Sequence, residues 1–151
     1  METDPTAAPP SLLELTAYLL SRVGKTARGR LAERLAADGL RLFHLAMLAA
    51  LADFGPHTQR DLARRLGLDP SDLAKAADQL AAAGHLDRTR DPADRRRLTL
   101  TLTTAGRTRL AELTAEAEAV QAELLAPLDA AERVQLHALL LRLYGGSGNG
   151  N

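Results

Sequence analysis

Between residues 57 and 84 the sequence places two sets of helix-boundary signals close together, and these constrain the fold more than any other feature. Thr58 to Asp61 resembles a capping box, which predicts a short helix that ends at Leu66 before Gly67. Asp69-Pro70-Ser71-Asp72 then supplies an N-cap, a proline at the first helical position and an acid in the first turn. It opens a second helix, which covers residues 71–83. Two short capped helices joined by a glycine-containing turn predict a helix-turn-helix.

The hydrophobic period changes after Gly84. Leu98 to Thr103 alternates strictly between leucine and threonine, which predicts a strand with one buried face. A shorter alternation at Leu86, Arg88 and Arg90 precedes it, and the residues between the two runs, 91–94, have the composition of a turn. We therefore expect a β-hairpin that projects as a wing over residues 88–99, next to the second helix.

Helical periodicity predicts four further helices around this region. Ser11 is a suitable N-cap for a first helix to about Ala36, and residues 40–53 are apolar nearly all round, as expected of a buried helix. A fifth helix begins near Thr104 and ends at Pro127, and a capping box at Asp129–Glu132 opens a sixth. The fifth carries apolar residues at heptad spacing, namely Leu110, Leu113, Ala117, Val120 and Leu124. Residues 1–10 are expected to form a disordered N-terminal tail and residues 145–151 a flexible C-terminal tail.

The fold class that follows is mainly α with a small β-hairpin wing (α+β). It is a winged helix-turn-helix over residues 40–107, flanked by N- and C-terminal helices over 11–36 and 108–144. A hydrophobic content of 46% fits one globular domain in the 11–144 region.

Composition narrows the function classes. The chain has no cysteine, which excludes a disulfide framework, a thiolate zinc site and a thiol-based redox switch. The four histidines lack metal-ligand spacing, and no phosphate-binding loop or nucleophile elbow is present. We therefore expect no enzymatic activity, no metal and no cofactor. No secretory signal and no membrane-spanning run is found, so a cytoplasmic location is expected.

Charge is distributed unevenly along a chain whose formal net charge is zero. Residues 57–107 carry ten basic and seven acidic side chains, so the basic surplus coincides with the predicted helix-turn-helix and wing. The position of positive charge matters more for phosphate attraction than the total does. This distribution favours double-stranded DNA as a partner.

The second helix and the hairpin supply the candidate DNA contacts. Leu73, Ala76, Ala77 and Leu80 face the core of the expected fold, so the other side of the helix would enter the major groove. The hairpin concentrates five arginines on one small projection, and arginine suits insertion into the minor groove. The candidate residues are Ser71, Asp72, Lys75 and Gln79 on the helix, with Arg88, Arg90, Asp94, Arg95, Arg96 and Arg97 on the hairpin.

The residues of this region resemble the signature of the MarR family of winged helix-turn-helix regulators. The pattern comprises Leu80, the Gly84-His85-Leu86 exit, a wing with Asp94-Arg95-Arg96 at its tip, and Leu102-Thr103 followed by Gly106. The resemblance extends from Leu40 to Arg107, and the order of helices fits from Leu12 to Leu143. It implies that Asp94 orients Arg96, that Arg96 enters the minor groove, and that residues 11–36 and 108–144 form a homodimer. It also implies a ligand-responsive transcriptional regulator, a repressor, that binds a pseudo-palindromic operator.

The resemblance further implies a small anionic or phenolic effector. The candidate lining residues are Tyr18, Arg22, Phe43, His44, Met47 and His57. His44 interrupts an apolar helix, and it is either a buried histidine with satisfied hydrogen bonds or a ligand contact.

One alternative assigns a winged-helix module that binds proteins or serves as a dimer scaffold without specific DNA binding. Its support is the zero net charge and the presence of Asp72 and Asp78 on the groove-facing side of the second helix. A monomeric six-helix bundle with a hairpin is the alternative to the homodimer.

Overall fold

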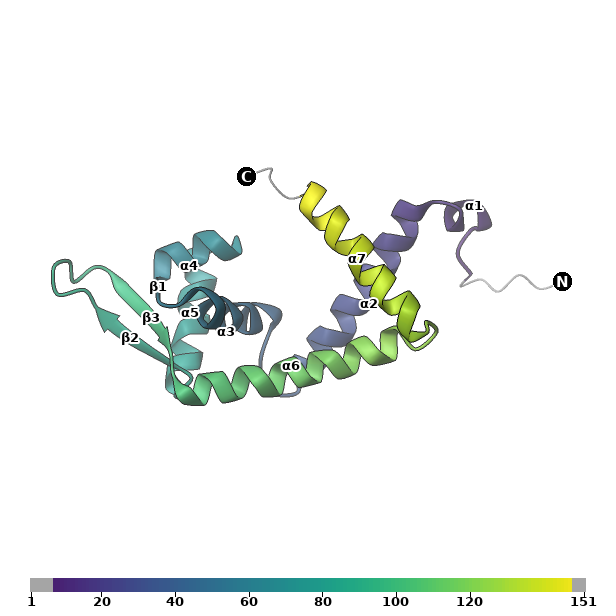
Figure 1. Ribbon diagram of the computed structural model, residues 1–151. Helices are drawn as coiled ribbons and strands as arrows, with labels where there is room; N and C mark the ends of the chain where they lie inside the picture. Colours follow the sequence, from purple (N-terminus) through teal and green to yellow (C-terminus); the bar gives the residue numbers. More distant parts are fainter. Residues whose placement is uncertain (1–6, 148–151) are drawn as a thin grey trace.

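A computed structural model describes residues 7–147, and within this range the chain is mainly helical with one small sheet (Figure 1). The elements in chain order are α1 Pro10–Leu13, α2 Thr16–Ala36, α3 Leu42–Phe54, β1 His57–Thr58, α4 Gln59–Leu66, α5 Pro70–Ala82, β2 Leu86–Arg90, β3 Leu98–Leu102, α6 Thr104–Leu124 and α7 Ala130–Ser147. The expected fold class is therefore confirmed.

The helix-turn-helix consists of α4 and α5, and its boundaries follow the capping signals. The Thr58 hydroxyl accepts a hydrogen bond from the Asp61 backbone N–H at 3.1 Å, and Asp69 accepts from the Ser71 N–H at 2.8 Å. Gly67 ends α4 in the left-handed conformation, with φ of 62°, which a residue without Cβ adopts at no steric cost. Hydrogen bonds from the Ser71 side chain and backbone lower the pKa of the Asp69 carboxyl.

The sheet has three antiparallel strands in the order β1-β3-β2, so it contains one strand more than the sequence predicted. β2 and β3 form the expected hairpin, in which Arg88 pairs with Leu100 and Arg90 pairs with Leu98. The additional strand, β1, places His57 opposite Leu100. Two residues are too few to show a period, so β1 left no signal in the sequence. Because β1 leads directly into α4, its pairing ties the helix-turn-helix to the base of the wing.

The core lies where α3, α5 and the sheet meet. The leucines of the helix-turn-helix and of the sheet are buried there with Met47 and Leu48 of α3; these leucines are Leu62, Leu73, Leu80, Leu86 and Leu100. Leu113 of α6 and Leu35 of α2 extend this cluster towards the flanking helices. Since Ala76 and Ala77 are also fully buried, the predicted inward face of α5 is confirmed.

The start of α6 packs unusually closely against the chain segment that precedes the wing. Thr103 caps α6 by accepting from the Gly106 N–H at 2.9 Å, and its own hydroxyl donates to the Gly84 carbonyl at 2.7 Å. The Thr103 N–H also donates to the carbonyl of His85 at 3.2 Å. A Cβ at position 106 would lie 2.1 Å from that carbonyl oxygen, so only glycine fits here. From this point α6 runs along one edge of the molecule to the turn before α7 (Figure 1).

In the terminal helices, three sequence-based boundaries differ from the structure. The first predicted helix is divided into α1 and α2, with Leu15 in an extended conformation between them. α1 begins at Pro10 because proline suits the first helical position, so Ser11 lies inside the helix and is not its N-cap. α7 continues to Ser147, past the expected start of the C-terminal tail at residue 145. Residues 1–6 and 148–151 of the two expected tails lie outside the described residues.

Large apolar side chains remain exposed on α2 and α7. On α2 these include Leu19, Leu20 and Val23, and on α7 they include Val134, Leu140 and Leu141. The side chain of Val134 is 72% exposed. Large apolar side chains grouped in this way on a helix are expected to be covered by another surface. Among residues 7–147, no helix is both long and apolar enough to cross a membrane.

Candidate nucleic-acid interface

The outward side of α5 presents a short polar surface at its N-terminal end. Ser71, Asp72 and Lys75 lie on this side, whereas Leu73 and Ala76 on the opposite side are buried. A lysine and a serine in the first turns of a helix can reach base edges or phosphates in a major groove.

Gln79, which the sequence placed on this surface, has a structural partner. Its Oε1 lies 2.6 Å from Nε2 of His44, a residue that is 2% exposed. The other ring nitrogen of His44, Nδ1, accepts the Arg41 backbone N–H at 2.9 Å, so Nε2 is the ring nitrogen that donates to Gln79. The contact joins α3 to α5. Of the two interpretations of His44, the structure supports the buried histidine with satisfied hydrogen bonds.

Asp78 and Arg88 also pair with each other. The Arg88 guanidinium donates to the Asp78 carboxylate, and the contact joins the outer face of α5 to β2 at the base of the wing. The negative charge of Asp78 is thereby compensated within the protein. Arg88 is correspondingly less available to DNA than the sequence suggested.

The wing tip has the Asp–Arg geometry that the sequence predicted. Asp94 Oδ1 accepts two hydrogen bonds from Arg96, from the backbone N–H and from Nε, each at 3.1 Å. The Arg96 side chain is nevertheless 92% exposed, so its guanidinium is held on one edge and open on the other. The side-chain bond from Arg96 is the main cause that lowers the pKa of the Asp94 carboxyl, which keeps Asp94 ionised.

Further hydrogen bonds fix the conformation of the loop between β2 and β3. Arg90 Nη1 donates to the Arg95 carbonyl at 2.8 Å, and the Asp91 N–H donates to the Arg97 carbonyl at 3.0 Å. Arg90 is thus used mainly to hold the loop. Arg95, Arg96 and Arg97 are left as the exposed cations of the tip.

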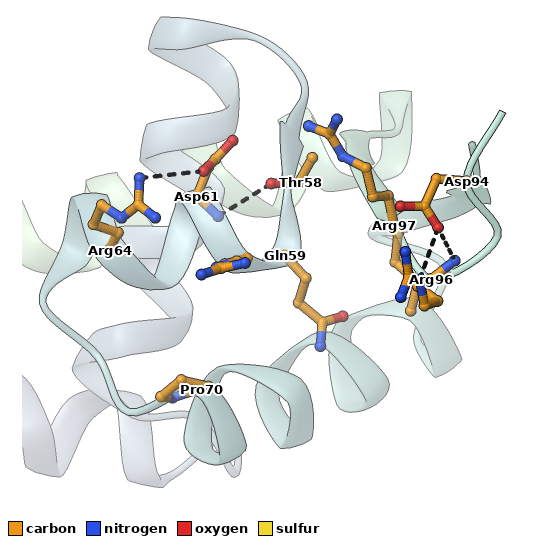
Figure 2. Close-up of a pocket in the computed structure, with 10 residues that line it drawn as sticks. Thr58, Gln59, Asp61, Arg64, Pro70, Asp94, Arg96 and Arg97 are labelled. Atoms are coloured by element: carbon orange, nitrogen blue, oxygen red, sulfur yellow. Dashed lines mark hydrogen bonds and ion pairs between the residues drawn. The ribbon is translucent and has the colours of Figure 1, made fainter.

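A cleft of about 810 Å³ separates the wing from the start of the helix-turn-helix (Figure 2). One wall comes from α4 and the first residue of α5, and the opposite wall comes from the wing, with Asp94, Arg96 and Arg97. The α4 wall includes Arg60 and Arg64, two arginines that could not be predicted from the sequence because nothing in α4 distinguishes them from an ordinary solvated helix face.

The six residues expected to line an effector pocket lie on three elements, α2, α3 and β1, and their surroundings differ. Met47 is fully buried in the core beside His44. His57 Nδ1 is bonded to the Gly55 carbonyl at 2.8 Å, and its Nε2 accepts from Arg65 at 2.9 Å. Tyr18 and Arg22 lie on α2, where Tyr18 is half-buried and Arg22 is exposed. Phe43 lies half-buried against the ring of His44.

Within residues 7–147, no cluster of histidine, aspartate and glutamate side chains is arranged to hold a metal ion.

The capped helix pair and the arginine-tipped hairpin define a winged helix-turn-helix protein. Residues 38–97 match the family model described as MarR family. The chain is 35% identical over 105 residues to the HTH-type transcriptional regulator YcgE of Bacillus subtilis (strain 168), with 68% of each chain covered. It belongs to the MarR family of transcriptional regulators.

Two solved structures extend this similarity over nearly the whole chain. A probable transcriptional regulator from Pseudomonas aeruginosa is 31% identical, with a TM-score of 0.69 over 87% of this chain and 98% of that one. CouR from Rhodococcus jostii RHA1, solved with bound p-coumaroyl-CoA, is 28% identical, with a TM-score of 0.67 over 89% of this chain and 95% of that one.

Proposed function

We propose that the protein is a ligand-responsive repressor that binds a pseudo-palindromic DNA operator as a homodimer. In this proposal α5 enters the major groove through Ser71, Asp72 and Lys75, and the wing reaches the adjacent minor groove through Arg95, Arg96 and Arg97. Two copies related by a two-fold axis would place their recognition helices about 34–36 Å apart, one turn of duplex.

The observation that carries the proposal is the state of Arg96. Its guanidinium is fixed on one edge by an ionised Asp94 and is almost fully exposed elsewhere. Holding a long side chain in one geometry costs conformational entropy. Because Asp94 already orients Arg96 in the free protein, less of this entropy is lost when a partner binds. An exposed, pre-oriented cation at the end of a projection is suited to the negative potential of a narrow minor groove.

The homodimer is supported by the uncovered apolar side chains of α2 and α7. Full burial of a leucine or valine side chain stabilises by roughly 1.5–3 kcal/mol, so covering Leu19, Val23 and Val134 alone favours association. Part of this gain is lost to the entropy of association. Both helices flank the winged region, as the dimerisation helices of the proposal require.

An effector of the anionic or phenolic class is supported by the relative that was solved with p-coumaroyl-CoA. Tyr18 and Arg22 are the proposed contacts, since a phenol ring and a guanidinium on an accessible helix can pair with an aromatic acid. His44 and Met47 are less suited, because both are buried with their neighbours in the core.

The test uses the full-length protein and duplexes selected from a random library, with binding followed by fluorescence anisotropy at several salt concentrations. We expect selected duplexes to bind more tightly than a mixed-sequence duplex, and Arg96→Ala to weaken that binding while sedimentation still reports a dimer. A dimer that selects no duplex and shows no salt-dependent binding would instead support the scaffold module. The pairing of Asp78 with Arg88 removes one argument for that module.

A further inference from the structure

Gln79 lies in a row of exposed polar residues on α5, and one end of its side-chain amide is already bound within the protein. Ser71, Lys75 and Gln79 follow one another at intervals of four residues, so they share one side of the helix. At about 1.5 Å per residue, Gln79 lies about 6 Å along the helix axis from Lys75, which is less than about two base-pair steps of DNA. A helix that brings Lys75 to the bases of a major groove therefore brings Gln79 close to them as well.

The buried ring of His44 determines which end of the Gln79 amide is bound. Its Nδ1 accepts the Arg41 backbone N–H at 2.9 Å, so Nε2 carries a hydrogen and donates it. The amide atom that lies 2.6 Å from Nε2 must therefore be an acceptor, and only the oxygen Oε1 is one. Within residues 7–147, the NH2 group of Gln79 has no hydrogen-bond partner. Gln79 thus uses its acceptor on α3 and keeps two donors for a ligand.

A glutamine held in this way cannot make the hydrogen bonds that a freely rotating glutamine makes. In the bidentate contact with adenine, the amide oxygen accepts from N6 and the NH2 group donates to N7, so both atoms must face the same base edge. Here Oε1 is turned towards the ring of His44, which is 2% exposed and lies against the ring of Phe43. Guanine presents two acceptors in the major groove, N7 and O6. It is the base edge that matches an NH2 group alone.

We propose that Gln79 reads a guanine in the major groove through its NH2 group, and that His44 is the positioning residue that excludes the contact with adenine. The inference rests on the proposed function and adds to it a residue that determines sequence specificity. Because the amide is oriented in the free protein, less side-chain entropy is lost when DNA binds. The hydrogen bond joins two helices that pack against each other, α3 and α5 (Figure 1). The base preference thus depends on a residue of α3 that itself touches no DNA.

The test selects bound duplexes from a random library and compares the base frequencies at every operator position between the full-length wild-type protein and its variants. Gln79→Ala is expected to abolish the base preference at one position of each half-site and to leave the other positions unchanged. At that position we expect the wild-type protein to bind guanine more tightly than adenine by roughly fivefold or more, measured by anisotropy on duplexes that differ only there. Circular dichroism checks that each variant is folded.

Two further variants separate the role of His44 from a general loss of stability. His44→Phe fills the site with a ring that cannot donate, so the released amide can turn, and the preferred base at that position is expected to change from guanine to adenine. Gln79→Glu keeps an acceptor for His44 and removes both donors, so guanine is expected to be replaced by cytosine, whose N4 donates. Gln121→Glu, at an exposed position of α6, makes the same change of charge away from α5 and is expected to keep the wild-type preference at every position.

The outcomes distinguish this inference from the proposed function. If the wild-type protein selects an operator but Gln79→Ala changes no position, or if the position that changes favours any base other than guanine, the inference is refuted and the repressor proposal stands. The positioning role of His44 is refuted if His44→Phe folds and keeps guanine. If His44→Phe does not fold, Gln79→Glu decides alone, and a retained guanine refutes the donor contact. If the wild-type protein selects no sequence, the proposed function itself fails, and the inference fails with it.

Discussion

Replacing Gly106 with alanine provides a quantitative test of how the wing is joined to α6. The added Cβ would lie 2.1 Å from the His85 carbonyl oxygen and 2.6 Å from Leu102 Cδ1. Even a favourable carbon–oxygen contact is about 3.3 Å long, so the first turn of α6 must move by roughly 1 Å. The obstacle includes backbone, and that same oxygen accepts the Thr103 N–H, so no flexible side chain can simply turn away.

The expected loss of stability combines three effects. Overpacking of this kind costs about 1–3 kcal/mol, and the shift weakens two hydrogen bonds of Thr103, each worth about 1 kcal/mol. Alanine recovers about 1 kcal/mol through its higher helix propensity. We expect Gly106→Ala to lower the free energy of unfolding by about 2–4 kcal/mol, a large part of the stability of an ordinary domain.

The assay is urea unfolding followed by circular dichroism, with every variant at the same protein concentration because dimer stability depends on concentration. Gly29→Ala in α2 is the control, since a Cβ there meets nothing within 4 Å and the backbone is helical. Alanine at position 29 should stabilise by about 0.5–1 kcal/mol. If both variants unfold at the same urea concentration, the close approach at Gly106 is refuted.

Three further predictions concern the wing tip and the contact between α3 and α5. Arg96→Ala should weaken binding to a selected duplex by about 1–3 kcal/mol. Arg96→Lys should not restore binding, because an ammonium group cannot reproduce the planar guanidinium that Asp94 holds. Anisotropy titrations measure both variants, and full rescue by lysine would contradict the role of the guanidinium. The folded-state pKa of Asp94 lies below its ordinary value of 3.8. The contribution of the Asp94–Arg96 pair to stability is therefore fully present above pH 3.8 and is lost only as the pH falls through the lowered pKa. Nuclear magnetic resonance titration of the carboxyl measures this pKa, and a midpoint above 3.8 would refute the prediction. His44→Phe should destabilise by about 1–3 kcal/mol, since it removes the hydrogen bonds that the buried ring makes with the Gln79 amide and the Arg41 backbone N–H. A double-mutant cycle with Gln79→Ala should give a coupling of at least about 0.5 kcal/mol in urea unfolding.

The features that the sequence predicted correctly are those set by neighbouring residues. The caps at Thr58 and Asp69 and the turn at Gly67 act within one helical turn, so their residue types suffice to locate α4 and α5. The Asp94–Arg96 contact joins residues two apart in a tight loop, and it too could be inferred from spacing.

The features that were missed depend on residues that are far apart in the chain or belong to different elements. β1 is a strand because His57 pairs with Leu100, and a segment of two residues has no hydrophobic period from which a strand could be predicted. The sequence predicted that Gln79 faces the DNA groove, but in the fold His44 of α3 lies against it and forms a hydrogen bond with its side chain. Arg60 similarly comes to line a cleft only because the wing folds across from α4.

The unbroken length of α6 has a mechanical consequence. With 21 residues at 1.5 Å per residue, the helix is about 32 Å long and connects the winged region to the turn before α7. Because β1 pairs with β3 of the wing and leads directly into α4, we expect the wing and the helix-turn-helix at the end of α6 to move together. Pivoting such a lever by about 6° displaces its tip by roughly 3.4 Å, which is one base-pair step of DNA. If the proposed effector binds near this pivot, a rotation of a few degrees is therefore enough to move the winged region out of register with the proposed operator.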